Sequence, residues 1–117
     1  MTENKIDLSY LEMVAGGDKT FVVSLIDMFL NSLPKDMAQV EAYFSNGDWL
    51  QAGRSAHKMK ATIQMMGLKE LSELVIKIEK IGKSGEETDQ LSTLVPLLTE
   101  QVNQLIVDLK QIQTELR

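Results

Sequence analysis

The amino-acid sequence predicts an all-α protein: an up-down-up-down, antiparallel four-helix bundle with a short amino-terminal helix as a lid. Apolar residues recur at three- and four-residue intervals along most of the chain, which is the period of an α-helix. Glycine and asparagine interrupt this period at a few places, and short connections between the later helices favour antiparallel neighbours. The 117 residues, 44% of them apolar, can form one core, so we expect a single domain over residues 1–117.

Two helices are expected in the first part of the chain. Asp7 can cap a short helix, which the glycines at 16–17 end. Asp18 can cap a long second helix, predicted over residues 18–45. Pro34 removes a backbone hydrogen bond inside it, so we expect a kink or a local break there. The apolar faces are formed by Leu8, Leu11 and Val14 in the first helix, and by Phe21, Leu25, Met28, Phe29, Leu33, Met37, Val40 and Phe44 in the second.

The only histidine, His57, lies near the middle of the third predicted helix, residues 48–67. Asp48 can cap this helix and Gln51 can complete a capping box, while Gly67 ends it. At about 100° per residue, His57 lies well away from the apolar face, so we expect it to face water or a partner. The inward face is Ala52, Ala56, Met59, Ile63 and Met66, and the sector of His57 also contains Leu50, Gly53, Lys60, Ala61 and Gln64.

Two further helices complete the predicted bundle. The fourth runs from about Leu68 to Ile81, and the segment GKSGEETD at residues 82–89 is the loop that follows it. The last helix has the most regular period in the chain, and Pro96 near its start indicates that it begins or bends there. The expected buried residues are Leu71, Leu74, Val75 and Ile78 in the fourth helix, and Val95, Leu98, Val102, Leu105, Leu109, Ile112 and Leu116 in the last.

Charge and composition exclude several classes of protein. A net charge of -5 and a pI near 4.8 disfavour binding to nucleic acid, which needs clustered Lys and Arg. The chain has no cysteine, no apolar segment of membrane-spanning length and no apolar run typical of a signal peptide, so we expect a soluble, cytoplasmic protein that does not bind membranes. Its first and last residues fit a stand-alone protein, with an excised domain as the alternative.

Three kinds of site are disfavoured by spacing. The segment GGDKT at residues 16–20 differs from a phosphate-binding loop because Asp18 separates glycine from lysine and no strand precedes it. A transition-metal site would need two or three carboxylates converging on His57, and no His/Glu pair has that spacing on one helix face. A hydrolase would need a Ser or Cys beside the histidine in a pocket, which an exposed helix face does not provide.

The remaining chemistry is that of His57 as a nucleophile. A neutral imidazole can attack a phosphoryl group through one nitrogen when the other is hydrogen-bonded. Lys60 supplies a cation for the added charge, and the small residues Gly53 and Ala61 leave room for a partner's active site. The acceptor for the second nitrogen has to come from another helix. The alternative is that His57 is an ordinary surface residue, which composition alone favours.

The segment HKMKATIQMMG, residues 57–67, resembles the signature of histidine-containing phosphotransfer (HPt) domains of two-component phosphorelays. That signature has a histidine, a lysine three residues later, then a small residue that is usually glycine, and a glycine six positions further on. His57, Lys60 and Gly67 match it, and Ala61 replaces the usual glycine. The resemblance extends over residues 6–116 and includes Gly16-Gly17-Asp18 followed by Phe21, then Phe29, and Gly47-Asp48.

The resemblance implies roles for individual residues. His57 would be the phosphorylated residue, and Lys60 would lie beside the phosphoryl group. Family members often have a Gln or Glu on the next helix that hydrogen-bonds the other ring nitrogen, and Glu79 takes that place. Lys83, one turn later, is a candidate second cation. Ala61 adds one methyl group beside the docking site, which bears on the fit of partners.

The function that the resemblance implies is that of a phosphorelay intermediate. His57 would accept a phosphoryl group from the aspartyl phosphate of a receiver domain and pass it to another receiver aspartate. The partners would be response-regulator receiver domains and hybrid sensor kinases. The receiver would supply Mg²⁺, so the chain would need no cofactor or metal of its own and would have no ATP-dependent kinase activity. The expected docking face is Leu50, Gly53, Ala61 and Gln64, together with Tyr10 on the first helix.

Two other functions are weighed against this one. A four-helix adaptor could bind a receiver-like or helical partner without any phosphotransfer. The presence of His57, Lys60 and Glu79 argues against it. A carboxylate metalloprotein built in a bundle core needs paired Glu-x-x-His motifs, and the single histidine excludes that pattern.

Overall fold

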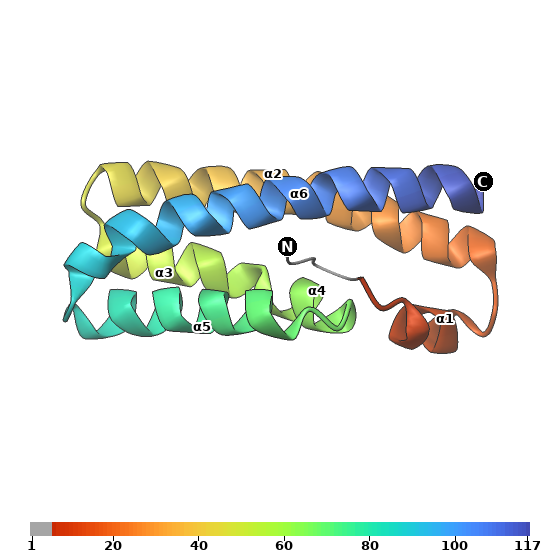
Figure 1. Cartoon of the computed structure of the whole chain (residues 1–117), viewed down its shortest axis with the longest axis horizontal. Helices are drawn as coiled ribbons and strands as arrows, with labels where there is room; N and C mark the ends of the chain where they lie inside the picture. Colours follow the sequence, from red (N-terminus) through yellow and green to blue (C-terminus); the bar gives the residue numbers. More distant parts are fainter. Residues whose placement is uncertain (1–5) are drawn as a thin grey trace.

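A computed structural model describes residues 6–117, and every element in that range is helical, which confirms the all-α prediction. Residues 1–5 of the predicted domain lie outside the described residues. The elements are α1 (Ser9–Ala15), α2 (Lys19–Ser45), α3 (Trp49–Lys58), α4 (Lys60–Met65), α5 (Lys69–Ser84), the 3₁₀ turn η1 (Thr88–Gln90) and α6 (Leu91–Leu116) (Figure 1).

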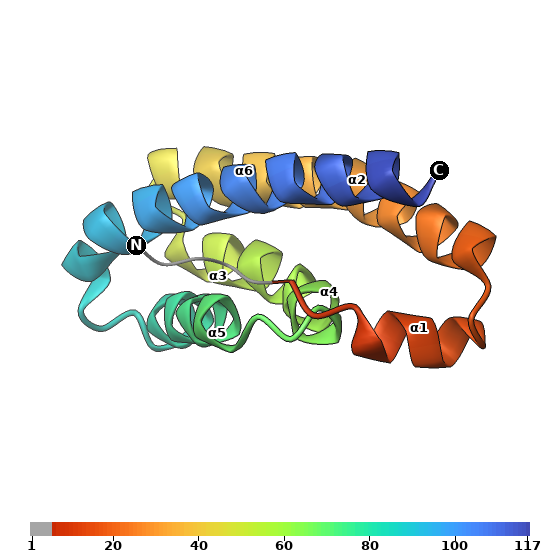
Figure 2. The same cartoon turned by 45° about the vertical axis from the view of Figure 1, so that its right-hand side comes forward.

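The helices form two layers in an elongated molecule of 44 × 25 × 21 Å. The long helices α2 and α6 form one layer, and α3, α4, α5 and α1 form the other (Figure 2). Helix α3 packs against α2 and α5, and α6 packs against the same two helices, so these four form a closed ring of neighbours. Successive members of the ring run in opposite directions, and α1 lies beyond α4 at the end where α2 begins (Figure 1).

The core runs between the two layers, and each main helix contributes a continuous apolar stripe to it. All five residues predicted for the inward face of the third helix are fully buried, as are the central positions of the last helix. Ile112 and Leu116 are half-buried and pack against this core. The buried members named here are Ala52, Ala56, Met59, Ile63, Met66, Leu98, Val102, Leu105 and Leu109. The three- and four-residue spacing of apolar residues therefore correctly predicted the buried faces of these helices.

Side-chain caps fix the starts of the two helices that lead to His57. The Asp18 carboxylate accepts hydrogen bonds from the Thr20 and Phe21 N–H groups, and Asp48 accepts one from the Gln51 N–H at 3.2 Å. Both caps agree with the sequence. The Asp48 N–H donates to a carbonyl of α2 at 2.9 Å, so it is not free for the reciprocal bond of the predicted capping box.

The turn after α4 anchors the segment that precedes α1. Gly67 has φ +69°, a left-handed conformation that favours glycine, and it ends this stretch as predicted. The Asp7 N–H donates to the Met66 carbonyl at 2.8 Å, and the Asp7 carboxylate accepts from the Ser9 N–H at 2.9 Å. Asp7 therefore connects the start of α1 to the end of α4, although it lies one residue before the cap position.

The buried face of α2 differs from the prediction in its first half. Phe21 and Met28 were expected inside, but they are 43% and 62% exposed, whereas Val22 and Ile26 are buried. The segment FVVSLIDMFL is apolar at so many positions that several registers fit it. The register that continues the regular stripe of the second half is the one that forms. That stripe is Val22, Ile26, Phe29, Leu33, Met37 and Val40.

Helix boundaries also differ in three places. Helix α2 continues through Pro34, so of the two predicted alternatives, a kink or a local break, the break does not occur. The predicted third helix is divided at Met59 into α3 and α4. Helix α5 extends to Ser84, and α6 begins at Leu91, ahead of Pro96, so the predicted loop is shorter than expected. Glycine and proline indicate boundaries only to within a few residues, because neighbouring side chains can hold the helix beyond them.

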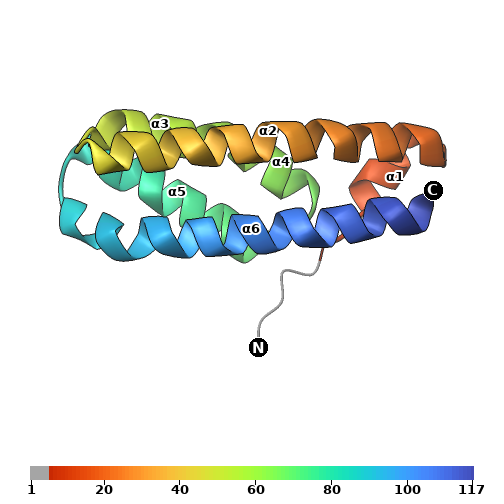
Figure 3. The same cartoon turned by 90° about the horizontal axis from the view of Figure 1, so that it is seen from above.

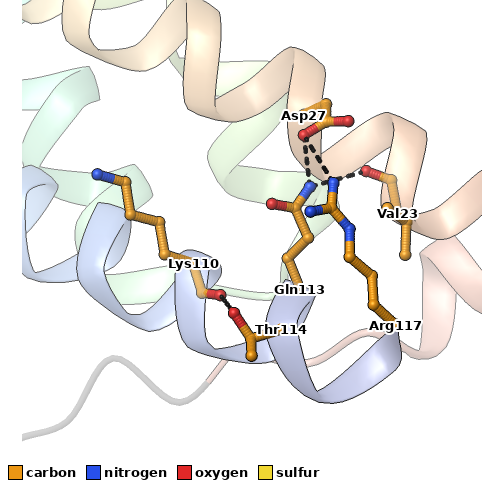
Figure 4. Close-up of polar contacts among 6 residues, drawn as sticks. All are labelled: Val23, Asp27, Lys110, Gln113, Thr114 and Arg117. Atoms are coloured by element: carbon orange, nitrogen blue, oxygen red, sulfur yellow. Dashed lines mark hydrogen bonds and ion pairs between the residues drawn. The ribbon is translucent and has the colours of Figure 1, made fainter.

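A polar contact joins the carboxyl end of α6 to the first half of α2 (Figure 4). Gln113 is only 8% exposed, and its amide nitrogen donates to the Val23 carbonyl at 3.2 Å and to the Asp27 carboxylate at 2.6 Å. Arg117 lies 3.8 Å from the same carboxylate. Figure 3 shows α2 and α6 following each other along the length of the molecule up to this end. None of the helices within residues 6–117 is long and apolar enough to cross a membrane.

Candidate functional site

His57 lies in the last turn of α3, directly before the point where α3 ends. The Met59 N–H bonds to the Ala56 carbonyl at 3.0 Å, a step of three residues in place of four. Met59 keeps a right-handed helical conformation, with φ -83° and ψ -11°, and is fully buried. A local tightening of the helix therefore separates α3 from α4. His57 precedes it, and its side chain is 51% exposed, in agreement with the expectation that it faces outward.

The imidazole of His57 is held from the neighbouring helix α5. Its Nδ1 lies 2.9 Å from Oε2 of Glu79, whose side chain is only 12% exposed. A neutral imidazole that donates from Nδ1 carries its proton there, and its free lone pair is then on Nε2. The structure thus brings together the two residues that the sequence paired across helices. The arrangement selects one tautomer, in which the lone pair of Nε2 is free and faces away from Glu79.

Glu79 has a second cationic partner. Lys83, one turn later on α5, lies with its Nζ 3.1 Å from the same Oε2 atom. Burial raises the pKa of Glu79, but hydrogen bonds from His57 and Lys83, together with their electrostatic attraction for the carboxylate, outweigh burial and hold this pKa below its ordinary value. Glu79 is therefore a carboxylate at neutral pH. Lys83 contacts the carboxylate that holds the ring.

Gly53 does not lie on the exposed face where the sequence analysis expected it. It is buried between α3 and α5, where a Cβ atom would lie 3.2 Å from the backbone of Glu79. The reason is that α3 packs against two helices, α2 and α5, so its buried arc is wider than its apolar stripe. Gly53 therefore cannot contact a partner, and its predicted place on the docking face is wrong.

The other predicted docking residues are exposed. Leu50 lies seven residues before His57 on α3, while Ala61 and Gln64 lie four and seven residues after it on α4. Tyr10 is 49% exposed on α1.

Lys60 was expected beside the ring as a cation. It is half-buried and forms no ion pair with a carboxylate in the described part of the chain.

Two residues of this region were missed. Ser72 is buried on α5, and its hydroxyl accepts a hydrogen bond from the Gln64 amide at 3.2 Å. Gly82, also on α5, lies against the backbone of α3. Once His57 and Glu79 are paired, antiparallel counting places Ser72 opposite Gln64, because Gln64 follows His57 by seven residues and Ser72 precedes Glu79 by seven. The same counting places Gly82 near Gly53, because they lie three residues after Glu79 and four before His57, respectively. Within residues 6–117, no group of His, Asp and Glu side chains is arranged to hold a metal ion.

Comparison with known protein families gives one match. The family model described as Hpt domain matches residues 24–114, a range that includes α3, α4 and α5, most of α2 and nearly all of α6. His57, Glu79 and Lys83 all lie within it. Neither the curated proteins nor the solved structures contain a match to this chain.

Proposed function

Because the chain belongs to the Hpt domain family, which has a general role in phosphorelay histidine phosphotransfer, we propose that it is a phosphorelay intermediate whose acceptor is His57. His57 accepts a phosphoryl group from the aspartyl phosphate of one receiver domain and passes it to an aspartate of another. The observation that carries this assignment is the 2.9 Å contact between Nδ1 of His57 and the Glu79 carboxylate. His57 is also the only histidine of the chain.

The proposed reaction follows from the tautomer that Glu79 selects. The Nε2 lone pair attacks the phosphorus of the aspartyl phosphate, a nitrogen–phosphorus bond forms, and the bond to the aspartate oxygen breaks, which releases a carboxylate. The proton on Nδ1 stays in place, so the ring becomes positively charged. The ionised Glu79 stabilises this charge across the existing hydrogen bond. In the reverse direction an aspartate oxygen attacks the phosphorus, and neutral His57 leaves.

The surroundings of His57 fit a role in which the partner supplies the remaining groups. We propose that the receiver brings Mg²⁺ and most of the electrostatic stabilisation, so that no cofactor of this chain takes part. Lys60 and Lys83 are the two cations of this chain that we propose to assist at His57, and Lys83 already contacts Glu79. Hpt domains work with response-regulator receivers and kinases in general, and hybrid sensor kinases are the proposed kinase partners here.

The proposed docking face uses exposed side chains around His57. We propose that this face consists of Leu50 on α3, Ala61 and Gln64 on α4, and Tyr10 on α1, with α1 as a lid on an up-down-up-down bundle. In this proposal the whole chain is one domain and works in the cytoplasm, where it meets receiver domains.

The direct test is incubation with a panel of phosphorylated receiver domains. Transfer should give a phosphoryl group on this chain that is labile in acid and stable in alkali, as expected for phosphohistidine. His57→Gln should give none. A chain that binds a receiver but never becomes phosphorylated by any of them would be the non-catalytic adaptor, and the proposal would then be wrong.

A further inference from the structure

Helices α3 and α5 touch backbone to backbone at two glycines. A Cβ atom on Gly53 would lie 3.2 Å from both the Cα and the carbonyl oxygen of Glu79, and 3.4 Å from the Cα of Gly82. A Cβ atom on Gly82 would collide with the Trp49 carbonyl oxygen and lie 3.2 Å from the Cα of Gly53. No flexible side chain stands between the two helices at this point, so neither position has room for a methyl group without a shift of backbone.

The backbone conformation does not require glycine at either position. Gly53 and Gly82 lie inside helices, and neither has a positive φ. Glycine inside a helix is less favourable than alanine, because the unfolded chain has more conformational freedom to lose. The two glycines therefore weaken their own helices, and what they provide is the close approach of α3 to α5.

This contact lies next to the bond that holds the imidazole. Gly53 precedes His57 by one helical turn, and Gly82 follows Glu79 by three residues, so in an antiparallel pair the two contacts are neighbours. The two backbone atoms that a methyl group on Gly53 would approach most closely belong to Glu79 itself. The spacing of the helices at the glycines thus sets how far the Glu79 carboxylate is from the ring.

We infer that Gly53 and Gly82 are positioning residues for the acceptor: they hold α5 close enough to α3 for Glu79 to reach Nδ1 of His57 and fix the tautomer. Hydrogen bonds between nitrogen and oxygen span about 2.7–3.2 Å, and the His57–Glu79 contact at 2.9 Å has only a few tenths of an ångström to spare. A methyl group at Gly53 uses up that margin. The effect on the ring is independent of the proposed function, and only the effect on transfer rests on it.

The test compares Gly53→Ala with Ala52→Gly. Ala52 is the neighbouring residue on the same helix and is fully buried, so Ala52→Gly destabilises α3 without pushing α5 away. Nitrogen-15 NMR of the ring reports the tautomer of His57 in the folded protein, even when stability has changed. Wild type and Ala52→Gly should carry the proton on Nδ1. Gly53→Ala should shift the population towards the tautomer with the proton on Nε2.

The rate of phosphotransfer provides a second measurement. Gly53→Ala should slow transfer by about tenfold, by analogy with the lower end of the loss that follows removal of a group that orients a metal-bound histidine. Glu79→Asp withdraws the carboxylate by one methylene and leaves both glycines intact, so it should have the same effect on the tautomer. Because both variants act through one hydrogen bond, the double variant should be little worse than either single one.

Two results would overturn the inference. One is a His57 ring in Gly53→Ala that keeps its proton on Nδ1 as in wild type. The other is an equal change of tautomer in Ala52→Gly, which would show that loss of helix stability and not helix spacing is the cause. If wild type accepts no phosphoryl group from any receiver, the proposed function fails, but the tautomer comparison still decides whether the glycines position the ring.

Discussion

At the scale of single residues, the site depends on one carboxylate oxygen with two partners. Oε2 of Glu79 lies within hydrogen-bond distance of both His57 and Lys83. One oxygen can accept both bonds, but the positive charge that the proposed transfer would place on the ring would strengthen only the bond to His57. Lys83 therefore helps to keep Glu79 ionised, while Glu79 orients the ring of His57.

Replacement of the acceptor should separate chemistry from stability. His57→Gln should abolish phosphoryl acceptance, because the amide nitrogen is not a nucleophile. Its free energy of unfolding should stay within about 0.5 kcal/mol of wild type, as for ordinary surface positions, because the side chain is 51% exposed and glutamine can still donate to Glu79. Urea denaturation measures the stability. A much larger loss would show that His57 is part of the packing of α3 on α5.

Replacements of Glu79 should slow phosphotransfer to two different degrees. Glu79→Gln keeps an oxygen that accepts from Nδ1 but loses the negative charge, whereas Glu79→Ala loses both. Transfer should be slowed in the order wild type, Gln, Ala, with Ala about tenfold to a hundredfold below wild type. Single-turnover transfer from a phosphorylated receiver measures this. Equal rates in wild type and Glu79→Ala would remove Glu79 from the mechanism.

The lowered pKa of Glu79 also predicts a pH dependence of stability. Its pKa is lower in the folded chain than the value of 4.5 of an ordinary glutamate, so the unfolded state binds the proton more readily. The stabilisation is complete above that ordinary value and disappears as the pH falls through the lowered pKa of the folded state. The difference in unfolding free energy between wild type and Glu79→Gln should therefore shrink on acidification from about pH 6 to about pH 3. A difference that does not change over this range would contradict the shift.

At the scale of helices, the sequence predicted the buried residues most accurately in helices that have a single apolar stripe facing the core. The inward residues of α3 and α4 and the central stripe of α6 follow the helical period and are buried as expected. In the first half of α2 apolar residues are too frequent for the period to select a register. For Gly53 the sequence offered no signal of burial, because glycine has no apolar side chain and the contact depends on a second helix.

A bulky residue on α4 should test the proposed docking face. Ala61 is exposed one turn after His57, so Ala61→Trp should hold a receiver away from Nε2. Transfer depends on near-attack distances of about 3–3.5 Å, and we expect it to fall at least a hundredfold. Val107→Trp is the matched control, because Val107 is 56% exposed on α6, a helix that does not carry the acceptor. Transfer that survives Ala61→Trp would mean that the receiver docks elsewhere.

At the scale of the whole molecule, the sequence could predict the fold class and the outward position of His57, but not the distances between helices. His57 and Glu79 are 22 positions apart, and the sequence pairs them only through the family resemblance. Whether their side chains meet depends on how closely α3 approaches α5. That spacing is set by the contact of Gly53 with Gly82, which neither hydrophobic period nor capping residues reveal.

The polar contact between α2 and α6, formed by Gln113 with Val23 and Asp27, should stabilise the fold without affecting phosphotransfer at His57. Gln113 is nearly buried, and its amide nitrogen bonds both the Val23 carbonyl and the Asp27 carboxylate. Gln113→Ala removes both bonds and should cost about 1–3 kcal/mol of unfolding free energy. Thr114→Ala is the control, because the Thr114 hydroxyl is exposed and bonds only within α6, to the Lys110 carbonyl. It should change stability by less than about 0.5 kcal/mol.

Transfer by the folded Gln113→Ala variant should remain at the wild-type rate, because the acceptor is held by α3 and α5 and not by the polar contact between α2 and α6. Urea denaturation and single-turnover transfer on the same samples measure the two effects. A slower transfer by fully folded Gln113→Ala would show that the two layers of the molecule are coupled, so that the position of α6 on α2 reaches His57 through α5.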